Sequence, residues 1–139
     1  MNRTNHTQIE TKNSLPQSIR AQSIELLNRN LPMAIDLDRQ AKQAHWNVKG
    51  PNFIALHELF DKVSETAEEF TDLLAERATA LGGTAEGRLH AVVESSSLPR
   101  YPGEIVSGAE HVDALSTALA SFGKSARGDG RGRATPQLR

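Results

Sequence analysis

The sequence contains no cysteine, and aromatic residues make up only 4% of its 139 positions. Without cysteine, the chain can form neither a disulfide framework nor a thiolate metal site. No apolar run approaches the length of about 18 residues that a membrane-spanning helix needs, and the N-terminal region lacks the apolar core of a signal peptide. The sequence therefore predicts a cytoplasmic protein with no membrane span.

Strand signals are also scarce. Val, Ile and Thr occur only in short runs, and apolar residues recur instead at steps of three and four. This spacing places them on one side of a helix. A chain of this length can form one domain with its own core, so the sequence predicts a single all-α domain.

The net charge of −1 is unevenly distributed. Residues 14–122 hold nine Lys and Arg against fifteen Asp and Glu, whereas residues 1–13 carry a net charge of +1 and residues 123–139 one of +4. The acidic body should attract metal cations and repel a phosphate backbone. The basic ends allow non-specific contact with nucleic acid, although the C-terminal end has no aromatic residue to stack on a base.

Two long helices are predicted before residue 84. The first follows Pro16 and keeps its apolar stripe past Pro32, so we expect a kink there but no break. Gly50-Pro51-Asn52 should separate the helices, with Asn52 as N-cap of the second. The second helix should end at Gly82-Gly83. Its stripe is the most regular in the chain and predicts the bundle core: Phe53, Leu56, Phe60, Val63, Ala67, Phe70, Leu74, Ala78 and Leu81.

A third long helix is predicted from about Ile105 to Phe122, after a connection over residues 84–103 with a short helix near Leu89–Glu94. Beyond Phe122 the pattern stops, because residues 123–139 contain four glycines, a proline and one large apolar residue. Such a segment buries too little surface to order itself as a helix. We therefore predict a polar tail over 1–13, a helical domain over 14–122 and a disordered Gly/Arg-rich tail over 123–139, whose composition looks out of frame.

Four ionisable residues share one face of the predicted second helix. His57 and Asp61 form one i, i+4 pair, and Asp72 and Glu76 form another. The pairs lie fifteen residues apart, about 22 Å along a helix, so one chain cannot wrap both around one metal ion. Two copies packed antiparallel about a twofold axis near Ala67 would bring each pair against the other. The spacing therefore predicts two equivalent His/carboxylate sites shared between two subunits.

A second imidazole belongs with this site. His45 lies near the end of the first predicted helix and His57 near the start of the second, so a short turn lets them face each other. Imidazole combined with carboxylates suits Fe(II), Mn(II) or Zn(II). The chain has no Glu-x-x-His motif, which argues against a conventional ferritin-type di-iron site.

The segment from Lys42 to Phe53, together with Asp61, Asp72 and Glu76, closely resembles the Dps family of mini-ferritins. The resemblance extends from about Ser14 to Lys124. It implies a ferritin-like antiparallel helix bundle. Family members close this bundle with a fourth long helix, which we expect to be absent here. Without it, we expect a chain of marginal stability, prone to aggregate or dimeric at best.

The resemblance also implies a ferroxidase. In the family, the centre lies between subunits: His45, His57 and Asp61 would come from one subunit, and Asp72 and Glu76 from its twofold mate. The implied activity is oxidation of Fe(II) by hydrogen peroxide, with Fe(III) stored as mineral inside a hollow dodecamer and DNA protected from oxidative damage. Trp46, beside His45, would serve mainly in packing, with a secondary role as an electron source.

Two other interpretations stay open. The chain could be a non-enzymatic stress protein that compacts DNA non-specifically through its basic ends, in the bacterial nucleoid. It could also be a truncated remnant that keeps the metal motif but cannot assemble. The remaining histidines singled out, His90 and His111, are expected to be structural or simply exposed.

Overall fold

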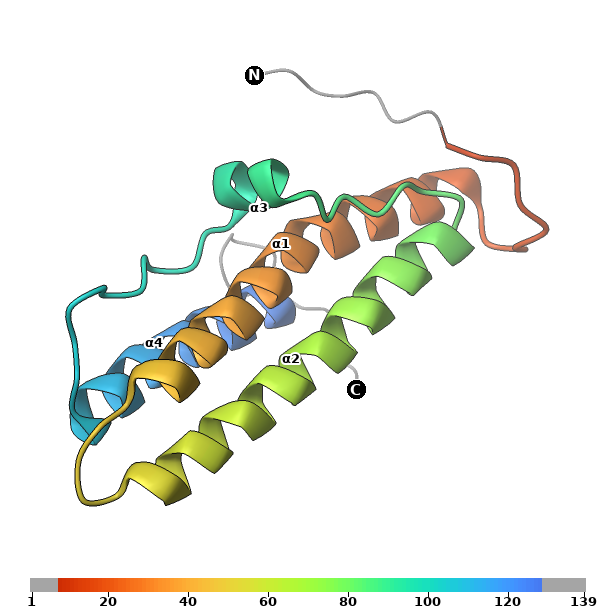
Figure 1. Ribbon diagram of the computed structural model, residues 1–139. Coiled ribbons are helices and arrows are strands. Elements are labelled where there is room, and N and C mark those ends of the chain that lie inside the picture. Colours follow the sequence, from red (N-terminus) through yellow and green to blue (C-terminus); the bar gives the residue numbers. More distant parts are fainter. Residues whose placement is uncertain (1–7, 129–139) are drawn as a thin grey trace, which may run out of the picture.

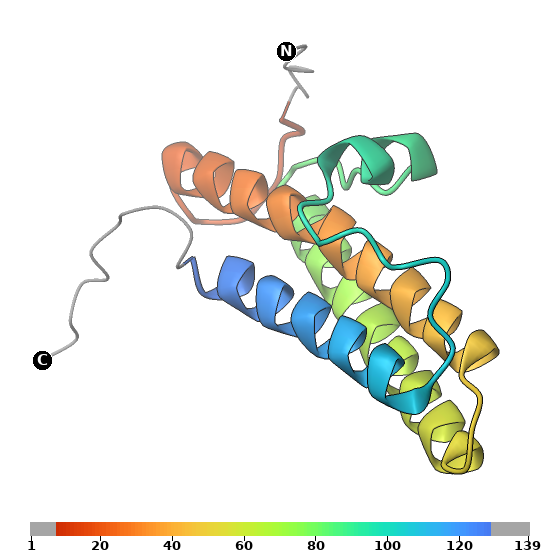
Figure 2. The same ribbon diagram turned by 90° about the vertical axis from the view of Figure 1, so that its left-hand side faces the viewer.

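The computed structural model describes residues 8–128, which form four helices. These are α1 (Gln17–Asn47), α2 (Phe53–Ala80), α3 (Leu89–Ser95) and α4 (Gly108–Arg127). In Figure 1, α1 and α2 run antiparallel as a long hairpin, and the short α3 lies over α1. Figure 2 shows α4 alongside this hairpin, running antiparallel to α1. Three long helices therefore share one core, and α3 covers its edge.

The hairpin forms largely as the sequence predicts. Helix α1 is continuous through the buried Pro32. The turn between the helices uses Gly50 with a φ of 122°, a conformation that a side chain disfavours. Asn52 occupies the N-cap position of α2, but its side chain makes no capping hydrogen bond. Helix α2 ends before Gly82, which has a φ of 90°.

The prediction that the chain lacks a fourth helix is wrong. The described residues contain four helices, and α4 is the C-terminal one. A complete capping box begins it, in which the Ser107 side chain accepts a hydrogen bond from the Glu110 amide and the Glu110 side chain accepts one from the Ser107 amide. This motif satisfies two amides that a helix start otherwise leaves unpaired. The expectation of a marginal chain that is dimeric at best loses its basis.

The helix predicted from about Ile105 to Phe122 corresponds to α4. Its predicted end is also wrong, because α4 continues to Arg127. Lys124 and Arg127 lie in its last turn, where positive charge interacts favourably with the helix dipole. Ser125 donates a hydrogen bond of 2.8 Å to the Asn30 side chain of α1. Gly128 then ends the helix in the left-handed conformation. Together these contacts outweigh the low helix propensity of Gly123.

Parts of both predicted tails lie outside the described residues, so the division of the chain into a domain between two tails stays a prediction. Near the start of the described chain, the Ile9 amide donates a hydrogen bond of 2.7 Å to the Gly82 carbonyl, in the turn after α2. The predicted disorder over 123–139 concerns mostly residues 129–139, which are not described. Across the described part of the chain, no helix is both long and apolar enough to cross a membrane.

The core consists of two apolar clusters between α1, α2 and α4. One contains Met33, Leu37, Ala67, Leu98 and Ala118, and the other contains Ala41, Ala44, Val48, Phe60 and Leu115. The predicted stripe of α2 is only partly core. Phe60, Ala67, Ala78 and Leu81 are buried, whereas Phe53 and Phe70 are 42% and 48% exposed. The second cluster includes Ala44 and Phe60, the residues that precede His45 and Asp61 in the chain.

Candidate metal centre

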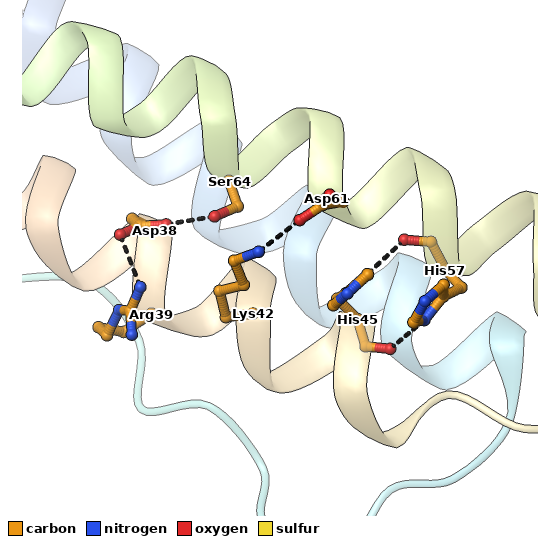
Figure 3. Close-up of polar contacts among 7 residues, drawn as sticks. All are labelled: Asp38, Arg39, Lys42, His45, His57, Asp61 and Ser64. Atoms are coloured by element: carbon orange, nitrogen blue, oxygen red, sulfur yellow. Dashed lines mark hydrogen bonds and ion pairs between the residues drawn. The ribbon is translucent and has the colours of Figure 1, made fainter.

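The imidazoles of His45 and His57 face each other across the α1–α2 seam. His45 belongs to the last turn of α1 and His57 to the second turn of α2. Their ring centroids are 3.7 Å apart and the rings are inclined by 18° (Figure 3). The turn at Gly50 and the buried Ala44 and Val48 bring the two helix ends this close. The structure thus pairs the two histidines as the sequence predicts.

Each imidazole is held by the backbone of the other helix. His45 Nδ1 lies 2.6 Å from the His57 carbonyl oxygen, and His57 Nδ1 lies 2.7 Å from the His45 carbonyl oxygen. A carbonyl can only accept, so both Nδ1 atoms carry a hydrogen and donate it. In the neutral rings, both Nε2 atoms therefore present lone pairs. This is the usual arrangement of histidines that bind a metal through Nε2.

The crossed hydrogen bonds also complete the end of α1. Helix α1 ends at Asn47, so the His45 carbonyl is among the last four, which lack an intrahelical donor. The amide four residues later, that of Lys49, donates instead to Val106 at 3.0 Å. The His57 ring takes that place at the His45 carbonyl. The contact that sets the hydrogen on Nδ1 of His57 therefore also completes the end of α1.

Asp61 lies one turn beyond His57 on α2 and forms an ion pair with Lys42 of α1 (Figure 3). The hydrogen bond from Lys42 holds the pKa of this carboxyl below its usual value, and the positive charges of Lys42, His45 and His57 lower the pKa further. Asp61 is therefore ionised at neutral pH and close enough to sense both histidines. Its bond to the Lys42 ammonium group is one that a metal cation would replace.

A second carboxylate follows along the same seam. Asp38 of α1 accepts a hydrogen bond from Ser64 and pairs with Arg39 at 3.0 Å (Figure 3). Both of its oxygens are thus engaged within the chain, which makes it a link between the helices. The seam therefore has a structural end at Asp38 and an end with free imidazole nitrogens at the histidines.

Asp72 and Glu76 lie further along α2, and both are exposed. Within residues 8–128, no three His, Asp or Glu side chains come together closely enough to hold one metal ion. The chain therefore brings His45 and His57 together, sets Asp61 beside them, and leaves Asp72 and Glu76 apart. This matches the separation that the helical spacing requires.

Other residues singled out in the sequence differ in environment. Trp46 is 61% exposed, so it does not pack within the chain. His90 on α3 is exposed, as expected. His111 is only 1% exposed and its Nδ1 is hydrogen-bonded to the Tyr101 hydroxyl. The sequence analysis missed this pair because the connection before α4 has no periodic pattern to place Tyr101.

The sequence matches the sequence model of the ferritin-like domain over residues 24–127. It is 46% identical, over 106 residues, to a DNA protection during starvation protein of Agrobacterium fabrum, covering 76% of this chain and 65% of that protein. It is 33% identical to DNA protection during starvation protein 2 of Deinococcus radiodurans, covering 73% and 42%. The chain thus spans less than two thirds of these curated relatives.

Solved structures of Dps proteins share the fold of this chain. DpsA14 from Streptomyces coelicolor superposes with a TM-score of 0.82 at 30% identity, covering 88% of this chain and 73% of that one. Dps from Microbacterium arborescens, in its high iron form, superposes with a TM-score of 0.74 at 30% identity, covering 83% and 73%. The matched sequence region begins within α1 and includes both histidines and all of α2.

Proposed function

Because this chain belongs to the ferritin-like family, and within it to the Dps proteins, we propose that it oxidises Fe(II) with hydrogen peroxide at sites shared between two copies. The observation that carries the proposal is the crossed pair of hydrogen bonds between His45 and His57. It leaves the two Nε2 atoms as the ring nitrogens that can bind a metal, and Asp61 beside them is ionised. Imidazole and carboxylate together suit Fe(II), and the carboxylates favour the Fe(III) product.

The remaining ligands come from a second copy in this proposal. Asp72 and Glu76 are exposed and lie about 22 Å along α2 from His57 and Asp61. An antiparallel α2 of a partner subunit would bring that subunit's two carboxylates to the His45/His57 site. Two observations support this interface. Ile54 and Leu73 of α2 are 62% and 63% exposed, and Ile54 shares the helical face of Asp61. Large apolar side chains on such a face favour contact with another protein surface.

The chemistry needs two Fe(II) for each hydrogen peroxide. Two Fe(II) supply one electron each, the O–O bond breaks, two protons are taken up, and two water molecules and two Fe(III) result. Iron is the substrate here. The two-electron course consumes iron and peroxide together, and so removes the reagents from which hydroxyl radicals form. DNA is then protected even if the chain does not bind it.

Storage and DNA contact are further parts of the proposal. The resemblance implies a shell of twelve subunits that holds Fe(III) as mineral, and the relatives in Agrobacterium and Deinococcus are named for DNA protection. Lys124 and Arg127 are exposed at the end of α4, and exposed cations are the groups that bind a phosphate backbone. Such contact would be non-specific and would weaken with added salt.

Mixing two damaged chains tests the shared site. His57→Ala/Asp61→Ala should remove one half of every site, and Asp72→Ala/Glu76→Ala the other half. Each variant alone should lose peroxide-dependent Fe(II) oxidation, followed by stopped-flow absorbance of Fe(III). After subunit exchange, mixed dimers regain one intact site, so activity should partly return. Glu25→Ala, an exposed carboxylate elsewhere on α1, is the control. No recovery despite exchange demonstrated by mass spectrometry would refute the sharing of ligands.

A further inference from the structure

Tyr101 and His111 form a hydrogen-bonded pair behind the histidine site. Tyr101 lies in the connection before α4, and His111 lies in the first turn of α4. The Tyr101 hydroxyl is hydrogen-bonded to His111 Nδ1, and the rings stack with centroids 5.9 Å apart and an angle of 19°. Tyr101 is the only tyrosine in the chain, and Trp46 is the only tryptophan. Any tyrosine chemistry of this protein therefore occurs at this pair.

Both members are neutral at neutral pH. Burial lowers the pKa of His111, against a smaller opposing effect of Glu110 and the Ile105 backbone. Burial also raises the pKa of Tyr101 to about 12. A neutral phenol can donate its hydrogen to the lone pair of a neutral imidazole, and at this pair that requires His111 to carry its own hydrogen on Nε2. Nε2 of His111 finds no hydrogen-bond partner within residues 8–128, so the bond through Nδ1 is the polar anchor of this ring.

Apolar side chains connect the pair with the helix turns of the proposed iron site. The His111 ring centroid lies 6.4 Å from that of Phe60, which precedes Asp61 in α2 and is 2% exposed. Tyr101 packs on the same apolar cluster, which includes Ala44, the residue before His45. Closely packed side chains thus connect the phenol with the helix turns that carry His45, His57 and Asp61.

We propose that Tyr101 and His111 act together as a proton-coupled one-electron donor to oxidants formed at the iron site. This inference rests on the proposed function. It concerns the case in which one Fe(II) meets hydrogen peroxide without a second. That reaction gives Fe(III), hydroxide and a hydroxyl radical. The radical takes one electron from Tyr101 and becomes hydroxide, the phenolic O–H bond breaks, and the proton forms an N–H bond at His111 Nδ1.

The electron and the proton that leave Tyr101 are both accounted for. Tyr101 becomes a neutral tyrosyl radical and His111 an imidazolium, which later gives its proton to hydroxide to form water. An oxidised phenol is a strong acid, so electron loss is slow unless a base accepts the proton at the same time. A positioned base within hydrogen-bond reach meets this need. Trp46, at 61% exposure, would instead deprotonate into the surrounding water.

Flash oxidation of the metal-free protein tests the pair. Trp46→Phe leaves Tyr101 as the only readily oxidised aromatic residue, and a photogenerated ruthenium(III) polypyridyl complex serves as oxidant. We expect a tyrosyl radical by transient absorption and electron paramagnetic resonance, and no such signal in Trp46→Phe/Tyr101→Phe. Trp46→Phe/His111→Gln should form the radical about a hundredfold more slowly, because the internal base is lost. An unchanged rate would overturn the proposal.

A second measurement needs no change at the buried His111. In Trp46→Phe, the rate of Tyr101 oxidation should not depend on the concentration of buffer base, because the proton acceptor is internal. A rate that rises with buffer base would show that the proton leaves to solvent, and would overturn the role of His111 as the proton acceptor. Circular dichroism checks that each variant keeps its helices.

The last experiment uses Fe(II) and hydrogen peroxide in place of the flash oxidant. Trp46→Phe mixed with equal amounts of Fe(II) and hydrogen peroxide should also give the tyrosyl signal. Iron oxidation without that signal, in protein that passes the flash test, would overturn the role at the iron site. If iron is not oxidised at all while flash oxidation proceeds as expected, the pair is supported and the failure belongs to the proposed ferroxidase.

Discussion

His45 and His57 cap each other: Nδ1 of each ring donates to the main-chain carbonyl of the other, at 2.6 and 2.7 Å. The contact joins the end of α1 to the start of α2 across a turn of five residues, 48–52. It therefore stabilises the hairpin before any metal arrives. It also fixes which nitrogen is free, so the same two hydrogen bonds serve the fold and the proposed iron site.

These two roles can be separated by substitution at His57. The side-chain amide nitrogen of His57→Asn can take the place of Nδ1, whereas nothing replaces Nε2. We expect His57→Asn to keep the stability of the hairpin and to lose Fe(II) binding, measured by anaerobic titration calorimetry. His57→Ala should lose both, with an unfolding free energy lower by about 0.5–1.5 kcal/mol, the usual contribution of one hydrogen bond. Full Fe(II) affinity in His57→Asn would show that Nε2 is not a ligand.

Lys42 and Fe(II) should compete for Asp61. Lys42 pairs with this carboxylate and lowers its pKa, so a metal ion must displace an ammonium group. Lys42→Met removes that competitor and one positive charge while keeping a long side chain. We expect tighter Fe(II) binding at neutral pH by up to about fivefold, the range of exposed ion pairs. Arg39→Met, which removes a neighbouring cation paired with Asp38 instead, is the control. Weaker binding in Lys42→Met would mean that Lys42 assists the site.

The hairpin was predictable because its signals are local. Apolar steps of three and four define both helices, and the Gly50-Pro51 break forces the turn that pairs His45 with His57. The end of α4 was not predictable from composition. Gly123 resembles a helix stop, but Ser125 bonds to Asn30, which is 95 residues away in the chain. A contact of that range cannot be inferred from helix propensity.

The candidate site was predictable to a similar degree. Helical spacing places Asp61 near His57 and keeps Asp72 and Glu76 away, because the rise per residue is fixed. It says nothing about Lys42, whose bond to Asp61 depends on how α1 and α2 are rotated against each other. The Tyr101–His111 pair depends on the path of an irregular connection. Sequence periodicity carries no information about such a path.

Gly82 should tolerate substitution less well than Gly50, although both have positive φ values of 90° and 122°. An alanine Cβ at Gly82 would lie 2.4 Å from the Ile9 carbonyl oxygen, whereas one at Gly50 would have nothing within 4 Å. Each alanine adds backbone strain of about 1–3 kcal/mol to the folded state. Gly82→Ala must in addition displace residues 8–9 from the turn. We expect a lower thermal midpoint for Gly82→Ala than for Gly50→Ala, and equal midpoints would contradict the close approach.

His111 should make the fold less stable in mild acid. Burial lowers its pKa below the ordinary value of 6.5, so the unfolded chain binds a proton at this residue at a higher pH than the native chain does. Its contribution to stability is therefore complete above about pH 6.5 and is lost as the pH falls through the native pKa. Urea unfolding at a series of pH values should show this loss.

The matched variants are His111→Gln and His90→Gln. His111→Gln removes the titrating group, so its unfolding free energy should fall less steeply between pH 7 and pH 5 than that of the parent chain, even if it is less stable overall. His90→Gln changes an exposed histidine and should keep the parent slope. His45 and His57 remain in both variants, so the comparison isolates His111. If the two variants showed the same slope, the buried imidazole would not be a source of the acid sensitivity.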